Sequence, residues 1–244
     1  MHTDIKDINN ARRSIMLKAI FFIVLLGLTG CVAAPQQPIP LDESALTSQG
    51  AEKNLQVGIM MTDIPAPNVF LPGADCLLCM GVAEVNHSRM SKHVDALKPD
   101  DFSLVKSDLV SELKEKGVEV VVIDEILVAA DLPKNKSEAP NTSNVDFSQY
   151  KELYGITHLL VIDIAYLGIE RQYASYIPRG DPYAAIGGIS YLVDLNDNSY
   201  KWYLQINFVK AANGEWDEPP TFPALTNAYH QVIEMAREAI VAEF

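Results

Sequence analysis

The spacing of apolar residues along the chain predicts five β-strands. Each is a short apolar or alternating run, rich in β-branched and aromatic side chains and bounded by turn-forming residues. The strands are expected at 55–62, 118–123, 157–167, 185–195 and 200–209, and the β-branched run at 118–123 predicts a buried strand. Asp and Asn residues crowd positions 194–198, so the last two strands are expected to form an antiparallel hairpin.

A spacing of three and four residues predicts helices elsewhere. The clearest case is Phe102, Val105, Leu109 and Leu113, followed by Gly117 as a C-terminal stop. Further helices are expected at 77–97, with Val82, Val85, Met90, Val94 and Leu97 buried, and at 147–154 and 224–244. Pro65, Pro67, Pro72 and Gly73 are expected to exclude regular structure between the first strand and the first helix.

The order of these elements defines the expected fold. Strands separated by helices favour parallel pairing through right-handed crossovers, and the late hairpin adds antiparallel strands. The sequence therefore predicts an α/β domain over residues 55–244, with a mixed sheet and helices in one or two flanking layers.

An apolar run near the N-terminus predicts a secretory signal. Four basic residues lie among the first eighteen, and an apolar segment of ten residues, 19–28, follows them. Ten residues rise about 15 Å as a helix, which is too short for a hydrocarbon core of about 30 Å. Residues 1–30 are thus expected to be a signal segment that does not remain as a membrane span.

The tetrapeptide Leu28-Thr29-Gly30-Cys31 at the end of this run resembles the lipobox of bacterial lipoproteins. The resemblance implies cleavage before Cys31 and acylation of its new N-terminus, including a palmitate-type chain that anchors the protein in the bilayer. Val32 stands where lipoproteins retained in the inner membrane often carry Asp, so the family rule favours the outer membrane, with the domain facing the periplasm. The alternative is an ordinary cleaved signal in which Cys31 is incidental.

Residues 31–54 read as a tether between the lipid anchor and the folded domain. They are rich in Pro, Gln, Ser and small residues, and they show no apolar period. A flexible chain of this length has a root-mean-square reach of about 25–30 Å. The domain is therefore expected to stand clear of the lipid surface.

The charge of the chain argues against nucleic acid as a partner. The formal net charge is −13 at pH 7, and loss of residues 1–30, with four basic and two acidic residues, would leave −15. Phosphate contacts by Lys and Arg supply most nucleic-acid affinity, and an anionic lipid surface would also repel this chain.

A second resemblance concerns the domain itself. The helix that ends in Glu115-Lys116-Gly117, the aromatic segment 150–154 before a strand, and the run 188–195 leading into Tyr200-Lys201-Trp202 look like periplasmic lipoprotein domains related to the TolB N-terminal domain and to the CsgG and penicillin-binding-protein-activator lipoproteins. The resemblance is at the level of the fold. It implies a protein that binds partners or assembles and does not catalyse a reaction.

Cys76 and Cys79 form the sharpest remaining motif. At this spacing two cysteines in an oxidising compartment can form a structural disulfide, remain buried thiols, or serve a redox centre. A redox role requires Cys76 at a helix N-terminus. A zinc site would add His87 and His93, but the spacing from Cys79 to His87 is shorter than a usual zinc-finger linker.

No motif of a known catalytic class stands out in the sequence. It lacks a Gly-x-Ser-x-Gly elbow, a His-Glu-x-x-His zinc motif and a phosphate-binding Gly-rich loop followed by a helix. Asp124 and Asp163 lie in or beside strands, where a structural role is the commoner one. We therefore expect no enzymatic activity, no cofactor and no resident metal.

The segment 171–183 is the strongest candidate for contact with a partner. It carries two Arg and three Tyr side chains in an otherwise acidic chain, and these residue types dominate binding energy at interfaces. They are Arg171, Tyr173, Tyr176, Arg179 and Tyr183. The alternative is a strand that continues past Leu167, followed by a packed loop.

These observations lead to one functional hypothesis and two alternatives. The chain is expected to be a membrane-anchored accessory or assembly factor of the cell envelope that binds a protein partner. The alternatives are a thiol-disulfide or metal-binding protein acting through Cys76 and Cys79, and a homo-oligomeric secretion component of the outer membrane.

Overall fold

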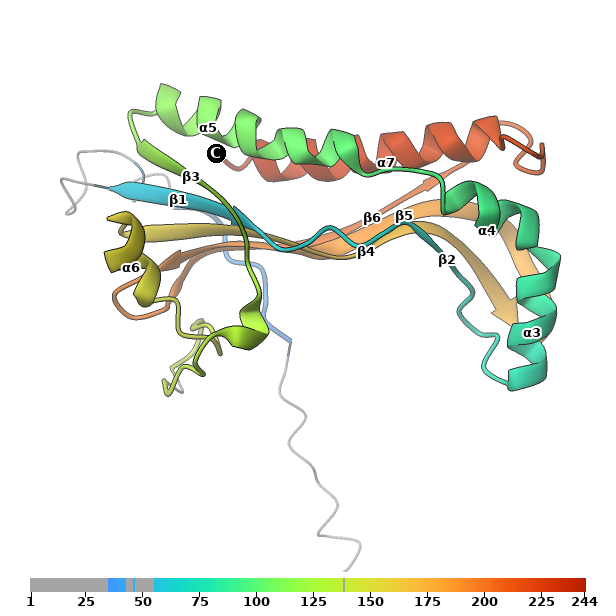
Figure 1. Ribbon diagram of the computed structural model, residues 1–244, viewed down its shortest axis with the longest axis horizontal. Helices are drawn as coiled ribbons and strands as arrows, with labels where there is room; N and C mark the ends of the chain where they lie inside the picture. Colours follow the sequence, from blue (N-terminus) through green and yellow to red (C-terminus); the bar gives the residue numbers. More distant parts are fainter. Residues whose placement is uncertain (1–34, 43–45, 47–54, 138) are drawn as a thin grey trace, which may run out of the picture. The chain divides into compact units, whose positions relative to one another are not determined.

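A six-stranded mixed sheet forms the centre of the structure, which is a computed structural model (Figure 1). This confirms the predicted α/β class. The strands lie in the spatial order β3 (Glu119–Ile126), β1 (Gln56–Met61), β4 (His158–Ala174), β5 (Ile177–Asp194) and β6 (Tyr200–Ala211), and β2 (Asn68–Phe70) also pairs with β4. Pairing is parallel between β3, β1 and β4 and antiparallel from β4 to β6, so the predicted late hairpin is confirmed.

The structure describes residues 35–42, 46, 55–137 and 139–244. The expected signal segment and the lipobox with Cys31 lie outside the described residues. Several residues of the expected tether contact the domain. Ile39 exchanges two backbone hydrogen bonds with Tyr203 in β6, Leu41 packs against the core, and Leu46 is buried in it. Among the described helices, none is both long and apolar enough to cross a membrane.

Strand β4 pairs with three other strands. Its first residues, 158–162, pair with β1, and 168–170 pair with β2 on the same edge, while β5 pairs along its other edge. Between β1 and β2 the prolines at 65 and 67 have no N–H to donate to β4. The expectation that this region lacks regular structure was wrong for 68–70, because the backbone N–H groups after Pro67 are free to pair.

Gly168 permits the close approach of β2 to β4. A Cβ atom at this position would lie 1.9 Å from the carbonyl oxygen of Asn68. This contact fixes the course of the chain that leads from β2 into the first helices.

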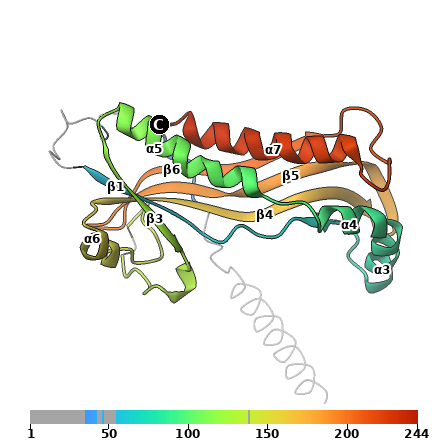
Figure 2. The same ribbon diagram turned by 45° about the horizontal axis from the view of Figure 1, so that its top comes forward.

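Two helices cover one face of the sheet (Figure 2). They are α5 (Val105–Glu115), preceded by the 3-10 turn η1 (Asp100–Leu104), and α7 (Pro223–Val241). Phe102, Val105, Leu109 and Leu113 are fully buried in the core on this side, as predicted. Their burial, together with the apolar side of α7, forms the main core of the domain.

The other face of the sheet is covered at one end only. There α6 (Gln149–Tyr154) and the loop before it, which contains the 3-10 turn η2 (Ala129–Asp131), pack on a cluster of aromatic rings. The rings of Tyr191 and Tyr203 stack at 6.1 Å, and Phe147 contacts Tyr191. Burial raises the pKa of the Tyr191 phenol well above its usual range.

The predicted helix over 77–97 is two helices. They are α3 (Leu77–Asn86) and α4 (Ser88–Val94), which meet at His87, where the backbone leaves helical geometry. Val82 and Val85, expected in the core, are exposed. The prediction failed because α3 turns its Cys79 and Ala83 side toward the protein.

Strand β3 is also less buried than predicted. It lies at the end of the strand order, and Val122 and Ile126 are exposed to solvent. A β-branched run suits a central strand and a strand at the end of the sheet equally well, so the sequence alone does not distinguish the two.

Candidate functional site

Three separate segments meet at the end of the sheet that α6 does not cover. They are the α3–α4 pair with the turn before it, the far part of the β4–β5 hairpin, and the connection between β6 and α7. We call this region, residues 71–94, 171–180 and 212–222, the distal end. The Tyr173 N–H donates to the Pro72 carbonyl at 2.8 Å and the Ser175 N–H donates to the Gly73 carbonyl at 3.0 Å, so the turn before α3 is tied to the end of β4.

The structure joins Cys76 and Cys79 in a disulfide at the start of α3. Cys76 is the N-cap residue, and its Sγ accepts a hydrogen bond from the Cys79 N–H at 3.0 Å. Cys76 is exposed, whereas Cys79 is buried against Ala74, Ala83 and Tyr173. The disulfide thus joins one exposed and one buried residue.

His87 links the α3–α4 junction to β4. Its Nε2 lies 2.8 Å from the Tyr173 hydroxyl oxygen and 3.4 Å from Arg171 Nη1. A guanidinium can only donate, so Nε2 is the acceptor and the imidazole is neutral. Burial lowers the pKa of His87, and the nearby Arg171 charge lowers this pKa further, against the opposing effect of Asp217.

Arg171 lies between this histidine and an aromatic ring from a distant part of the chain. Its guanidinium carbon is 4.6 Å from the centre of the Trp216 ring, and its Nε donates to the Gly180 carbonyl at 3.3 Å. A stacked guanidinium is held in orientation while its remaining N–H groups stay available. The Trp216 ring comes from the connection between β6 and α7.

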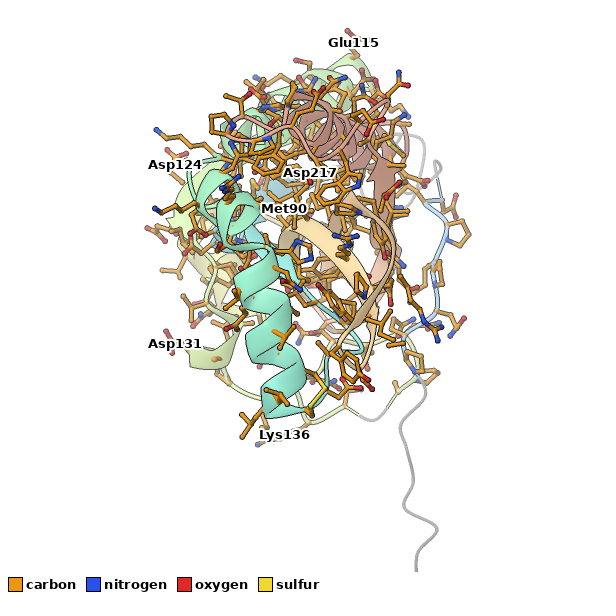
Figure 3. The ribbon with its side chains drawn as sticks, turned by 90° about the vertical axis from the view of Figure 1, so that its right-hand side faces the viewer. Met90, Glu115, Asp124, Asp131, Lys136 and Asp217 are labelled. Carbon is orange, nitrogen blue, oxygen red and sulfur yellow. A yellow bond between two sulfur atoms is a disulfide. The ribbon has the colours of Figure 1, made fainter. Side chains whose placement is uncertain are left out.

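These side chains line a pocket of about 530 Å³, which we call the His87–Trp216 pocket. Met90 and Asp217 lie on its wall, and Figure 3 shows them close together above α3, seen from the distal end. A larger groove of about 1080 Å³ lies along β2 and the other side of α3 and α4. Its lining includes four carboxylates, from Asp75, Glu84, Asp95 and Glu170, together with Lys92.

The five residues of the expected partner-binding segment separate in the structure. The segment continues β4 and turns into β5, so it is a long hairpin. Arg171 and Tyr173 line the His87–Trp216 pocket, Tyr176 and Arg179 are exposed near the tip, and Tyr183 bonds with Glu170 and Gln172. The five therefore do not form one surface.

A zinc site built from the two cysteines and two histidines has no support in the described residues. The cysteines are bonded to each other, and His93 Nε2 lies 2.7 Å from the Thr226 hydroxyl, away from His87 and its partners. Within the part of the chain that the structure describes, no three His, Cys, Asp or Glu side chains lie close enough to hold a metal ion.

The pocket residues that sequence reasoning missed include Arg89, Trp216 and Asp217. The available signal was a tryptophan between Gly214 and Pro219-Pro220, in a stretch too rich in turn formers for a strand or helix. A large aromatic residue in such a connection must find a packing partner elsewhere. The sequence did not indicate that this partner is Arg171.

Comparisons with known proteins do not assign the chain to a family. No protein-family model matches the chain, and no curated protein matches it. Among solved structures it is similar to the lipoprotein GNA1162 from Neisseria meningitidis, at 14% identity and a TM-score of 0.33, over 74% of this chain and 99% of that one. It is also similar to the hypothetical protein CT253 from Chlamydia trachomatis, at 8% identity and a TM-score of 0.32, over 78% of this chain and 99% of that one. TM-scores this low carry no functional argument, so function is argued below from the residues of this chain.

The neutral state of His87 predicts a specific pH dependence of stability. In the unfolded chain His87 binds a proton with its ordinary pKa of about 6.5, whereas in the folded chain this pKa is lower. The free energy of unfolding is therefore expected to fall as the pH drops below about 6.5. His87→Gln retains an acceptor for Tyr173 and Arg171 but does not titrate. Its unfolding free energy should therefore change less between about pH 7.5 and about pH 5.5, by at most about 1.4 kcal/mol per pH unit.

Chemical denaturation of both proteins at the two pH values measures this difference. His93, whose pKa is also lowered by burial, is present in both proteins and cancels in the comparison. Equal pH dependence in the two proteins would contradict the neutral assignment of His87.

Proposed function

We propose that this chain is a non-catalytic lipoprotein of the bacterial cell envelope that binds a protein partner through its distal end. In this proposal Cys31 is acylated and anchors the chain in the outer membrane, and the domain faces the periplasm. The lipobox Leu28-Thr29-Gly30-Cys31 and the charged and apolar segments before it support the anchor.

The single observation that carries the binding role is the exposed apolar surface of α3. Leu77, Leu78 and Val85 are 96, 76 and 74% exposed, although α3 is a short helix with only Cys79 and Ala83 buried. Large contiguous apolar patches on a protein surface mark interaction sites, and several large aliphatic side chains on one short helix can contribute to such a patch.

The hairpin tip adds apolar surface at the same end of the molecule. Tyr176 and Ile177 are exposed there, and the neighbouring Pro178 lines the same pocket as Val85. We call Leu77, Leu78, Val85, Tyr176 and Ile177 the distal apolar set. Tyr and aliphatic residues of this kind provide binding energy when a partner covers them.

Charge complementarity favours a protein partner with an apolar centre and a basic rim. A groove on the other side of α3 is lined by four carboxylates, and the chain has a net charge of −13. An anionic bilayer, or a second copy of this acidic chain, would instead be repelled by the like charge. The experiment below distinguishes binding to lipid and binding to a second copy from binding to another protein.

Site-specific photocrosslinking tests this proposal in the native membrane. A photoreactive residue in place of Leu78 should crosslink to one envelope protein, and Leu77→Ser combined with Val85→Ser should reduce that crosslink at least about tenfold, because the apolar contact area is lost. These side chains are exposed, so the free energy of unfolding should change by less than about 0.5 kcal/mol.

Leu153 provides the matched control, because it is an equally exposed leucine on α6 at the opposite end. A photoreactive residue at 153 should give no such crosslink. Crosslinks from position 78 to lipid alone, crosslinks to a second copy of the chain, or equal labelling from positions 78 and 153 would each overturn the proposal.

A second candidate function, thiol-disulfide exchange, is favoured by the accessibility of Cys76 at the N-cap of α3. A thiolate of a partner dithiol would attack Cys76 Sγ, break the bond to Cys79, and leave Cys79 to take up a proton. The second partner thiol would then attack the mixed disulfide and release Cys76 as a thiolate, which the helix N-terminus and the Cys79 N–H favour. The partner is oxidised by two electrons and the Cys76–Cys79 pair is reduced.

Serine variants test the exchange reaction. In Cys79→Ser, the Cys76 thiolate would attack the disulfide of an oxidised partner, which is the reverse of the reaction above, and would release one partner sulfur as a thiolate. Because no Cys79 thiol is present to displace the partner from Cys76, the mixed disulfide should accumulate and appear on non-reducing gels. Cys76→Ser leaves only the buried thiol and should show none. Absence of adducts with both variants, together with unchanged partner crosslinking, would leave the disulfide a purely structural one.

A further inference from the structure

The His87–Trp216 pocket concentrates positive charge in an acidic chain. Arg89 and Arg171 both line it, and Asp217 supplies one opposing charge. Neither arginine forms an ion pair with a carboxylate in the described part of the chain. With a neutral His87 the pocket carries about one net positive charge, which matches a monoanion.

The pocket presents this charge in a fixed direction. The Trp216 ring lies under the Arg171 guanidinium at 4.6 Å, while Arg171 Nε and Nη1 are engaged with the Gly180 carbonyl and His87 Nε2. A guanidinium has five N–H donors, so the others remain for a ligand. Two donors held in one plane fit the two oxygens of a carboxylate.

The remaining wall suits a small body that carries polar groups beside a short apolar part. Most of the exposed lining is polar, Trp216 and Pro178 add apolar surface, and the volume of about 530 Å³ falls within the range of small-molecule sites. One net positive charge would leave a phosphate dianion with an uncompensated negative charge. A carboxylate fits both the net charge of the pocket and the planar donors of Arg171.

We propose that the His87–Trp216 pocket binds a small ligand that carries a carboxylate, with Arg171 as the main anchor of that carboxylate. The carboxylate can belong to a free small acid or to the C-terminus of a peptide, and the experiment separates these sources. Val85 belongs both to the wall of this pocket and to the distal apolar set, whereas Arg171 and Trp216 belong to the pocket alone. Binding of a small acid at Arg171 is therefore measured separately from binding of the proposed partner.

Calorimetry and NMR on the full chain in detergent test the site with two probes. The probes are N-acetyl-leucine and a tetrapeptide that ends in leucine with a free carboxylate, each compared with its C-terminal amide. The free acids should bind and the amides should not. If the natural ligand is a free small acid, N-acetyl-leucine should bind at least as tightly as the tetrapeptide. If the natural ligand is the C-terminus of a peptide, the tetrapeptide should bind more tightly.

The two tryptophans of the chain provide an internal control. The indole N–H signal of Trp216 should shift on binding, whereas that of the buried Trp202, which donates to Glu243, should not. Arg171→Gln should weaken binding at least about tenfold. Arg179→Gln, an exposed arginine of the same hairpin outside the pocket, should leave affinity unchanged.

Arg89→Gln is a second pocket variant that is less exposed to misfolding effects, because Arg89 is exposed to solvent. It should weaken binding severalfold while the melting temperature stays unchanged. The proposal is overturned if acids and amides bind equally, if neither acid binds at millimolar concentration, or if both arginine variants of the pocket retain full affinity.

Discussion

The length of β4 is the constraint on which the rest of the structure depends. One strand pairs with β1 near its start, with β2 farther along the same edge, and with β5 along the other edge. Its first part lies in the main core beneath α5 and α7, and its last residues reach beyond that core to the distal end. Because a paired strand is stiff, this extension holds the distal end in a fixed relation to the sheet.

Tyr173, near the end of β4, connects this extension to the residues of the candidate site. Its ring packs against Cys79, its hydroxyl bonds to His87, and its backbone N–H bonds to the turn before α3. Arg171, two residues earlier, reaches His87 and Trp216. Helix α3, with its disulfide, and the His87–Trp216 pocket are therefore both held in place by the same few residues of β4. A small cluster of this kind has little apolar burial of its own, so the contacts of one tyrosine carry much of its order.

The sequence predicted the parts of this fold that local pattern decides. The α5 core residues recur with helical spacing, and the Asp and Asn cluster at 194–198 marks the β5–β6 turn. The burial of α3 could not be predicted in this way. The apolar residues of α3 are spread over more than one face of the helix. The face that becomes buried is the one on which Cys79 contacts Tyr173, a residue distant in the chain. The candidate site was found in part, since Cys76, Cys79, Arg171 and Tyr173 stood out by residue type. The residues that complete it, His87 and Trp216, gain their roles only from tertiary contacts with β4.

Hydrogen exchange on a pair of tyrosine variants tests most directly whether β4 organises the distal end through Tyr173. In Tyr173→Ala, the backbone amides of α3 and α4 should exchange at least about tenfold faster than in the native chain, while those of α5 and α7 keep their protection. Tyr176→Ala, which removes an exposed ring of the same hairpin, should leave exchange unchanged throughout. Unchanged exchange of α3 and α4 in Tyr173→Ala, or faster exchange spread over the whole domain, would contradict this account.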